Sequence, residues 1–376
     1  MKRNLIIFML FFNLSYQISF GSDFKVKEVT VDKEKNSWFM PREIGWLSGD
    51  AGHSIPLEKN RILWIFGDTW TGKFENNRLS PDKWYVHNSI AIQYLDSAGT
   101  SEIEFIFGKD EEGRAFFPNQ KNMPGKYLWP TNGFILDNSL YIFCQAVAHG
   151  ENGWFSISGS VIIEVINKGD HPKNWIKRYY DFKTPEWHGD EFQILYHSAL
   201  FEKDLYIYFM GFIIENRKRK AILSRMLKSD FIKNKDSKDL EHLVWEENLK
   251  IWSKTTQNRV YIFEPGNTES NIQYISDWDL YVTTTYTAID NKILLTYSKN
   301  LEGPWSDPQV VFENPIINCP EKTCIETYAV RSHPEFSQKT GEVIISYITS
   351  YTGDYKNANI NSYRPRFIKV YLEKVN

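Results

Sequence analysis

The chain has 376 residues, of which 42% are apolar and 24% are charged, and its formal net charge is −3. The apolar content is sufficient for a large core and excludes a mainly disordered chain, while the near balance of 44 basic and 47 acidic residues gives no basis for nucleic-acid binding. Aromatic residues make up 16% of the chain. They favour half-buried sheet surfaces, and they also stack on sugar rings.

The N-terminal segment predicts export. Lys2 and Arg3 precede an apolar run at residues 5–12, and small and polar residues follow. This order is typical of a signal peptide, here residues 1–21, and the apolar run is too short to span a membrane as a helix. No later stretch reaches that length. We therefore expect residues 22–376 to be the mature protein, secreted or periplasmic and without a membrane span.

Three cysteines are compatible with an exported protein. Cys319 and Cys324 are separated by four residues, and they could close a small disulfide loop outside the cytosol. Cys144 lies in a strand-like apolar run, and we expect it to be a buried thiol. The three cysteines do not offer the ligand number or spacing of a zinc site, and no loop signature for a metal bound by carboxylates is present. We predict neither a metal nor a cofactor.

A short apolar strand pattern recurs five times, with starts 62 to 77 residues apart. In each unit a second apolar segment and a polar turn precede it, which is a hairpin signal, and a third apolar run follows. Four of the units carry a fourth run as well. The five copies are Leu63–Phe66, Leu140–Phe143, Leu205–Tyr208, Leu280–Thr283 and Glu342–Ile345.

Four-stranded antiparallel sheets repeated around an axis form a β-propeller, in which only short edges stay exposed. Five units predict five blades in one all-β domain, residues 22–376. The last unit lacks a fourth strand because the chain ends, and segment 24–31 could supply it and close the ring. The alternative is a β-sandwich with irregular insertions, but sandwiches do not ordinarily repeat a strand quartet at this spacing. We expect the charged stretch 228–250 to be a solvated excursion with at most a short helix.

Two aspartates are predicted to converge on one end of the central channel. The first two strands of a blade run antiparallel, so the start of the first meets the end of the second. In the first unit these positions hold Asp50 and Asp68, and Gly49, Gly52 and Gly67 leave room for close backbone approach. Glycoside hydrolysis needs such a pair, because one carboxyl group donates a proton and the other attacks or activates water. Alternatively, these aspartates bind turn amides, a common role for Asp in loops.

Equivalent positions in the other units supply further candidates. Glu269 is a lone acid at the channel end of the fourth unit, where a buried carboxylate needs a partner or a purpose. Trp129 is either a sugar platform or blade packing, and Glu191 is either catalytic or a solvated loop acid. Arg331 could hold a catalytic carboxylate ionised. The remaining candidate substrate contacts are His53, Trp70, His87, Asn88, Tyr328 and His333, the last of which precedes a proline and could instead be a hydrogen-bonded structural histidine.

Several motifs resemble those of one group of proteins. Residues 49–57, 63–69 and 87–89, which read GDAGHSIPL, LWIFGDT and HNS, resemble the opening blade of exported bacterial five-bladed propellers catalogued as domains of unknown function. The nearest group with an assigned activity is the endo-D-arabinanase family. Residues 298–305 look like the Ser-x-Asp-x-x-Gly-Pro-Trp turn of arabinanase and xylosidase propellers, with Asn300 in place of the Asp. A last-blade signature of the same group is similar to Tyr328, Arg331, His333 and Pro334.

This resemblance implies a glycan-directed propeller in which Asp50 and Asp68 are the matched acidic pair. The acid that arabinanases and xylosidases carry in the third blade has no clear match here, and Glu191 and Glu269 are the competing candidates. The resemblance also implies that the turn keeps its role with Asn300.

The sequence therefore favours an exported, monomeric glycoside hydrolase that acts on furanose-containing or related polysaccharide through Asp50, Asp68 and Glu269. One alternative is a non-catalytic carbohydrate- or surface-binding propeller, in which Trp70, Trp129 and Tyr328 would stack on sugars. A protein-interaction scaffold would instead show broad apolar patches. No glycine-rich phosphate loop opens a helix, and the Gly-x-Ser-x-Gly nucleophile elbow is absent. The expected partners are poly- or oligosaccharides, and neither nucleic acids nor membranes.

Overall fold

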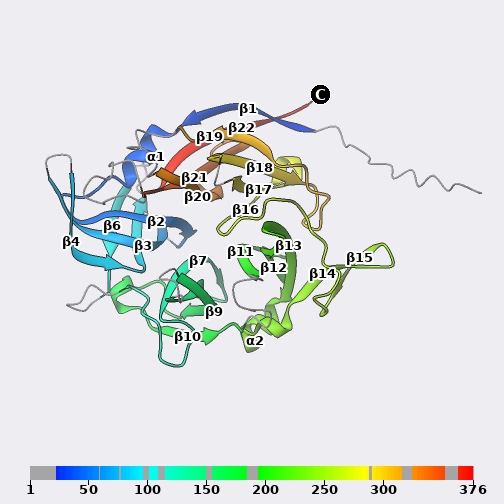
Figure 1. The fold of residues 1–376 in the computed structure, drawn as a ribbon, viewed down its shortest axis with the longest axis horizontal. Coiled ribbons are helices and arrows are strands. Elements are labelled where there is room, and N and C mark those ends of the chain that lie inside the picture. The colour runs from blue at the N-terminus through cyan, green and yellow to red at the C-terminus, as the bar shows by residue number, and fades with distance from the viewer. Residues whose placement is uncertain are drawn as a thin grey trace, which may run out of the picture.

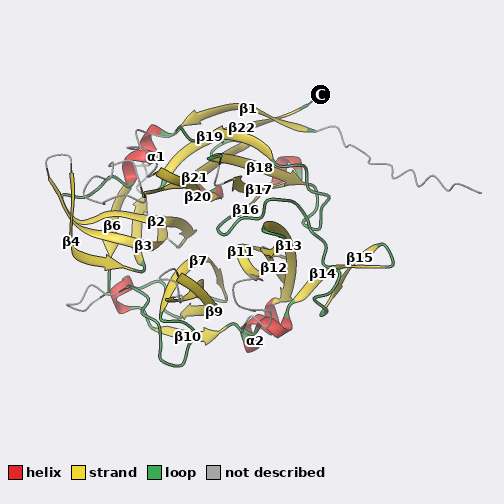
Figure 2. Cartoon of the chain, in the orientation of Figure 1, coloured by secondary structure: helices red, strands yellow, loops and turns green. Residues whose placement is uncertain are grey.

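The computed structural model describes residues 23–58, 60–75, 78–95, 101–108, 115–149, 155–183, 194–287, 290–315, 324–351 and 363–375. Within these ranges the chain forms five antiparallel sheets around a central axis (Figure 1). Strands make up most of the fold, and the helices are short (Figure 2). The predicted five-bladed propeller is confirmed. The predicted signal peptide, Glu191 and Cys319 lie outside the described residues, and so does the side chain of Cys324.

The first strand of each blade lies nearest the hub (Figure 1). Blade 1 contains β2 (Ile44–Pro56), β3 (Arg61–Glu75), β5 (Ser89–Leu95) and β6 (Ser101–Ile106), and β4 (Arg78–Val86) pairs with β3. Blade 2 contains β7 (Tyr127–Leu136), β8 (Ser139–His149), β9 (Phe155–Val165) and β10 (Lys177–Asp181). Blade 3 contains β11 (Ile194–Lys203), β12 (Tyr206–Glu215), β13 (Lys218–Leu227), β14 (Glu241–Glu246) and β15 (Leu249–Ser253).

Blades 4 and 5 complete the ring. Blade 4 contains β16 (Ile272–Ile275), β17 (Leu280–Thr287), β18 (Lys292–Ser298) and β19 (Gln309–Glu313). Blade 5 contains β20 (Cys324–Ser332), β21 (Glu342–Tyr351), β22 (Arg366–Lys374) and β1 (Phe24–Val31). The helices are α1 (Lys33–Trp38) and α2 (Lys228–Asn234), and short 3₁₀ turns occur at Pro172–Asn174, Ser237–Asp239, Ser276–Trp278 and Pro334–Phe336.

The two ends of the described chain close the ring. β1 pairs antiparallel with β22, from Phe24 opposite Lys374 to Val31 opposite Ile368. The N-terminal strand therefore supplies the outer strand that the last blade lacks, as the sequence predicted. This pairing gives the edge of β22 a partner, and it ties the first and last segments of the propeller together.

Each hydrophobic cluster lies between two neighbouring blades, so five clusters hold the five blades together. Aromatic residues dominate the cluster between blades 5 and 1, which contains Phe39, Trp46, Trp64, Phe66 and Phe367. Ring pairs in it are close, and Phe39 lies 4.8 Å from Trp64 between ring centroids. Large flat side chains fill the wedge between twisted sheets, which explains much of the high aromatic content.

Buried polar side chains join the blades near the hub. Asn132 Nδ2 donates to the carbonyl oxygens of Ser198 at 3.0 Å and Ser270 at 3.1 Å, and it thereby links β7 to the inner segments of blades 3 and 4. Asn267 Nδ2 donates to the carbonyl oxygen of Val330 in β20 at 2.6 Å. Because buried amides need their partners, these bonds fix neighbouring blades relative to one another.

Asn88 is one of these framework residues. Its Nδ2 donates to the carbonyl oxygens of Phe117 at 3.1 Å and Leu128 at 2.8 Å, and its Oδ1 accepts from the Phe117 N–H at 2.7 Å. The side chain is fully buried. The structure therefore corrects the expectation that Asn88 contacts substrate.

We expect Asn88→Ala to lower the free energy of unfolding by about 3 kcal/mol, because it leaves buried backbone groups without hydrogen-bond partners. Urea denaturation measures this loss. The exposed Asn122 supplies the control, since Asn122→Ala should change stability by less than about 0.5 kcal/mol. Equal effects of the two substitutions would contradict the structural role of Asn88.

The charged stretch 228–250 is more ordered than a solvated excursion. It contains α2, and Phe231 of α2 is fully buried. The Phe231 ring packs against Phe134, Tyr141 and Phe143 of blade 2, with centroid separations of 5.4, 5.0 and 6.0 Å. The expectation of a solvated segment is wrong in this respect, because one aromatic side chain anchors the excursion between blades 2 and 3.

Three smaller expectations also have outcomes. The Gly303 N–H donates to the Asn300 carbonyl at 3.0 Å and the Asn300 N–H donates to Ser298 Oγ at 3.1 Å, so the turn forms with Asn in place of Asp. Cys144 is a buried free thiol, as predicted. Among the described residues, no helix is both long and apolar enough to cross a membrane.

Candidate functional site

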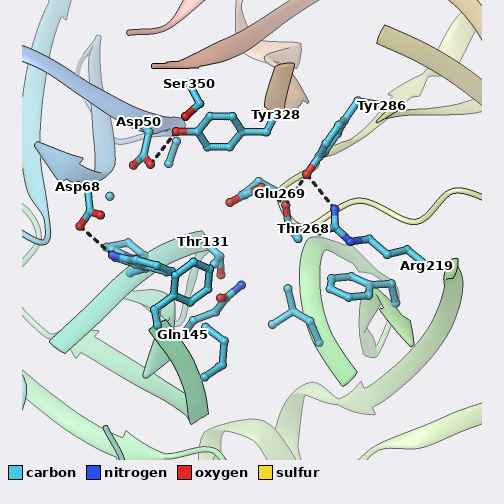
Figure 3. Close-up of a pocket in the computed structure, with 18 of the residues that line it drawn as sticks. Asp50, Asp68, Thr131, Gln145, Arg219, Thr268, Glu269, Tyr286, Tyr328 and Ser350 are labelled. Atoms are coloured by element: carbon cyan, nitrogen blue, oxygen red, sulfur yellow. Dashed lines mark hydrogen bonds between the residues drawn. The ribbon is translucent and has the colours of Figure 1, made fainter. Parts of the chain in front are cut away.

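A cavity of about 390 Å³ lies at the hub, and three carboxylates line it. Asp50 comes from β2, Asp68 from β3, and Glu269 from the segment that precedes β16. Figure 3 shows Asp50 and Asp68 on one side of this cavity, and Glu269 between them and Arg219. The structure thus brings the two aspartates to one cavity, as the strand order predicted, together with Glu269, which the sequence placed at the channel end of the fourth unit.

The backbone of β2 is irregular at Asp50. Its pairing with β3 shifts register between Gly49 and Ala51, and again between Ala51 and His53. Ala51 and Gly52 have φ angles of 63° and 71°, so both lie in the left-handed region. Glycine adopts this conformation freely, whereas for alanine it costs about 1 kcal/mol. Such bulges re-aim side chains, and strained backbone of this kind is typical of functional sites.

The neighbouring inner strand, β20, has a similar irregularity. Its pairing with β21 shifts register between Tyr328 and Arg331, and Ala329 has a φ angle of 49°. Tyr328 lines the cavity, and its hydroxyl donates to Asp50 Oδ2 at 3.0 Å. In both strands a left-handed alanine directly follows a residue of the cavity wall, and these two wall residues are hydrogen-bonded to each other.

Asp50 is half-buried and is held by two phenols. In addition to Tyr328, the Tyr363 hydroxyl donates to Asp50 Oδ2 at 3.1 Å. Burial raises the pKa of Asp50 well above its ordinary value, and the charges of Asp68 and Glu269 raise it as well, whereas the two phenol hydrogen bonds lower it. Burial also raises the pKa of both phenols, so they remain neutral donors. The net effect favours a protonated Asp50.

Asp68 lies among aromatic side chains. The Trp129 indole N–H donates to Asp68 Oδ1 at 2.9 Å, and His87 Nδ1 lies 3.1 Å from the same oxygen. Burial, the charge of Asp68 and a hydrogen bond to it together raise the pKa of Tyr85. The Asp68 side chain is 12% exposed. Donors around this oxygen offset the cost of burying a carboxylate.

Glu269 ends a row of polar groups along the cavity wall (Figure 3). Arg219 Nη1 donates to the Tyr286 hydroxyl at 3.0 Å, and that hydroxyl lies 3.2 Å from Thr268 Oγ1. Thr268 Oγ1 in turn donates to Glu269 Oε2. The row joins β13 and β17 to the segment before β16, and it fixes the position of the Glu269 carboxylate.

Arg331 is fully buried and does not line the cavity. Its Nη1 donates to the carbonyl oxygen of Thr131, a residue of the cavity wall, at 3.2 Å. Burial lowers the pKa of Arg331 to about 10, and the charges of Glu269 and Asp50 oppose that change. The guanidinium is therefore cationic at neutral pH. The structure corrects the expectation of substrate contact, and it leaves Arg331 as a buried charge near the carboxylates.

Two histidines that were predicted to contact substrate are instead buried between the strands. His53 is 2% exposed, and burial lowers its pKa well below the ordinary value. His333 is fully buried, with Nδ1 2.5 Å from Ser54 Oγ and Nε2 2.7 Å from Ser346 Oγ. Neither histidine lines the cavity. His333 connects β2 to β21, and the expectation of substrate contact is corrected for both histidines.

Several residues of the cavity wall were missed by sequence reasoning. Tyr363 precedes β22, Phe155 begins β9 and Arg219 lies in β13, and all three line the cavity. Arg219 stands in a basic run, Arg217–Lys220, which indicates a solvent-exposed strand end and does not reveal a residue of the hub. Thr268 had a signal, because it is adjacent to the singled-out Glu269.

The acids of this site do not form a recognisable metal centre. In the described part of the chain, no group of three or more His, Cys, Asp or Glu side chains is arranged to hold a metal ion. The arrangement instead offers carboxyl groups in different surroundings. One carboxyl group is held by phenols and has a raised pKa, and the other accepts a hydrogen bond from an indole N–H. Such a difference separates an acid from a base.

Comparison with known proteins adds a family and a fold. The family described as "Domain of unknown function (DUF5005)" matches residues 32–372. A solved structure from Bacteroides ovatus, provisionally called a hydrolase, has a TM-score of 0.72 at 20% identity and covers 91% of this chain and 90% of that chain. That likeness establishes a shared fold. No curated protein sequence matches the chain.

Two more distant structures are similar over most of this chain. One is a family 117 glycoside hydrolase of Zobellia galactanivorans, with a TM-score of 0.48, 10% identity, and coverage of 93% of this chain and 90% of that chain. The other is the xylan β-1,4-xylosidase of Bacillus halodurans, with a TM-score of 0.44, 12% identity, and coverage of 90% of this chain and 54% of that chain. At this distance they carry no argument about substrate.

Proposed function

The chain belongs to the family of the domain of unknown function DUF5005, and we propose that it is an exported glycoside hydrolase acting on furanose-containing or related polysaccharide. The observation that carries this proposal is a pair of carboxyl groups, Asp50 and Asp68, that line one cavity in chemically different surroundings. Hydrolysis of a glycosidic bond requires two carboxyl groups with separate roles. Export rests on the signal peptide predicted at residues 1–21.

Asp50 is the general acid of the proposed reaction. Its raised pKa keeps a proton available, and that proton moves to the glycosidic oxygen as the bond from this oxygen to the anomeric carbon breaks. Tyr328 and Tyr363 orient the carboxyl group. Asp68 is the second carboxyl group of the reaction. It either takes a proton from the attacking water, or it bonds to the anomeric carbon and is then displaced by a water molecule that gives its proton to Asp50.

Glu269 is the third carboxylate. Its charge contributes to the raised pKa of Asp50, and it would also stabilise positive charge that develops on the sugar ring in the transition state. The row of hydrogen bonds from Arg219 holds it in place. The buried positive charge of Arg331 interacts with Glu269 and Asp50, and it offsets part of their negative charge.

Release of sugars tests the proposal. Purified protein is incubated with arabinan, arabinogalactan and fructan, and new reducing ends are measured. We expect release from at least one polymer by the wild type and by Asp307→Asn, a control at an exposed aspartate. No release from any polymer, or undiminished release by both Asp50→Asn and Asp68→Asn, would contradict the proposal. Proton NMR of the first product identifies its anomeric configuration and separates the two routes for Asp68.

A second candidate function is carbohydrate binding without catalysis. The half-exposed aromatic side chains next to Asp68 favour it, because exposed rings in a concave site are typical of sugar contacts. Binding of a polysaccharide by the wild type with no release of reducing ends would support this candidate over the hydrolase.

A further inference from the structure

Six aromatic rings form a continuous row beside the cavity, which we name the aromatic strip. Neighbouring rings along it are 4.7, 5.8, 3.6, 5.4 and 4.7 Å apart between centroids. The Tyr127 and His87 rings are stacked, with an angle of 11° between their planes. In order, the members are Phe155, Trp129, Tyr127, His87, Tyr85 and Trp70.

Core packing does not account for the aromatic strip. None of its members belongs to the five hydrophobic clusters between the blades. Phe155 is 52% exposed and Tyr85 is 38% exposed, and the His87 side chain is 33% exposed. Contiguous exposed apolar surface of this kind marks a binding surface.

The aromatic strip is continuous with the site of the proposed chemistry. Trp129 and Phe155 line the cavity, and Trp129 and His87 contact Asp68. Beyond Asp68 the strip continues to Tyr85 of β4 and Trp70 of β3 in blade 1, and neither of these residues lines the cavity. A ligand that occupies the cavity and extends along the strip must therefore be longer than one sugar.

We propose that the aromatic strip binds the sugars that flank the scissile bond, so that the protein cleaves within a polysaccharide chain and not at its end. The nature of the ligand in this inference rests on the proposed function. Sugar rings carry C–H groups on their faces, and these faces pack on aromatic rings while the hydroxyl groups stay in water. A row of rings gives such contacts to successive sugars without a separate polar pocket for each.

The two ends of the strip provide the test. The double variant Phe155→Ala, Trp70→Ala removes one ring at each end and retains the rings that contact Asp68. Loss of two ring contacts that together contribute about 1.4 kcal/mol weakens binding about 10-fold. Affinity electrophoresis with arabinan, arabinogalactan and fructan measures binding. We expect at least one polymer to retard the wild type. The double variant should need an about 10-fold higher concentration of that polymer for the same retardation.

Trp245→Ala is the matched control, because Trp245 is an aromatic residue of β14 that is 44% exposed and lies outside the strip. It should bind as the wild type does, and the melting temperatures of all three proteins should agree. On a polymer that is cleaved, the double variant should raise KM about 10-fold with a smaller change in kcat. The first products of the wild type should be oligosaccharides of mixed length.

The outcomes separate the two proposals. If a polymer binds through the aromatic strip and is never cleaved, the proposal of a hydrolase is wrong and the proposal of sugar binding by the strip is retained. If the wild type and the double variant cleave a polymer with equal KM, the proposal for the aromatic strip is wrong and the hydrolase is retained. Release of monosaccharide only leads to the same conclusion. The proposal for the aromatic strip is also wrong if no polymer tested binds, or if Trp245→Ala weakens binding as much as the double variant does.

Discussion

Asp50→Asn is expected to lower kcat on polysaccharide about 1,000-fold, because it removes the proton that the leaving oxygen needs. An aryl glycoside with an acidic leaving group should recover most of that loss, since its leaving group departs without protonation. Asp68→Asn should lose activity on both substrates. Steady-state kinetics of the two variants on both substrates measures this difference. An Asp50→Asn variant that the aryl glycoside does not rescue would contradict the acid role.

The pH dependence of the same variant follows from the raised pKa of Asp50. Activity of the wild type requires the protonated form, so it should fall as the pH rises through that pKa. Asp50→Asn, assayed with the aryl glycoside, should lack this alkaline limb. A limb that persists unchanged in the variant assigns the titrating group to another residue.

The raised pKa also has a consequence for stability. The folded state holds the Asp50 proton more tightly than the unfolded chain, whose Asp pKa is about 3.9. Stability therefore declines as the pH rises from that value towards the raised pKa. We expect Asp50→Asn to be more stable than the wild type at neutral pH by about 1 kcal/mol, with the difference disappearing in acid below the ordinary Asp pKa. Calorimetry at several pH values measures it, and a less stable variant at neutral pH would contradict this account.

Gly67→Ala is expected to lower kcat about 100-fold, the scale of loss for a misplaced catalytic group. A Cβ at residue 67 would overlap Asp50 Oδ1, while the φ angle of Gly67 is not in the left-handed region, so space alone is the obstacle. Asp50 must then move, and its hydrogen bonds to Tyr328 and Tyr363 are lost or lengthened. Glycine is therefore needed at this position to leave space for the Asp50 carboxyl group, whereas the backbone conformation of the strand does not require it.

Gly169→Ala is the matched control, because a Cβ at residue 169 meets no atom within 4 Å. It should retain full activity. The measurement is kcat and KM for the two alanine variants, together with the pH profile of Gly67→Ala, in which the alkaline limb should shift as Asp50 moves. A Gly67→Ala protein with wild-type kcat and an unshifted profile would show that the close approach to Asp50 has no functional meaning.

The fold was predictable because the sequence pattern that specifies each blade is local and recurs along the chain. Apolar segments such as Leu63–Phe66 and Leu140–Phe143 recur at similar spacing, and each pairs with a partner across a short turn, so the blades follow from alternation and turn residues. The aspartate pair was predictable for the same reason, since Asp50 and Asp68 belong to one hairpin. The excursion at 228–250 was not, because the burial of Phe231 depends on a groove that blades 2 and 3 form only after they pack.

The sequence by itself determined five blades, their closure by segment 24–31, and three acids that line the cavity, Asp50, Asp68 and Glu269. Tertiary structure alone decided what surrounds those acids, because the ring brings together residues such as Asp50 and Tyr363, which are 313 positions apart. It also decided which polar candidates face the cavity. Bulges in the inner strands interrupt the simple alternation of side chains. Tertiary packing buries His53 and His333, which the sequence offered as substrate contacts. Local pattern specifies strands and turns, whereas the environment of a charge depends on every segment packed around it.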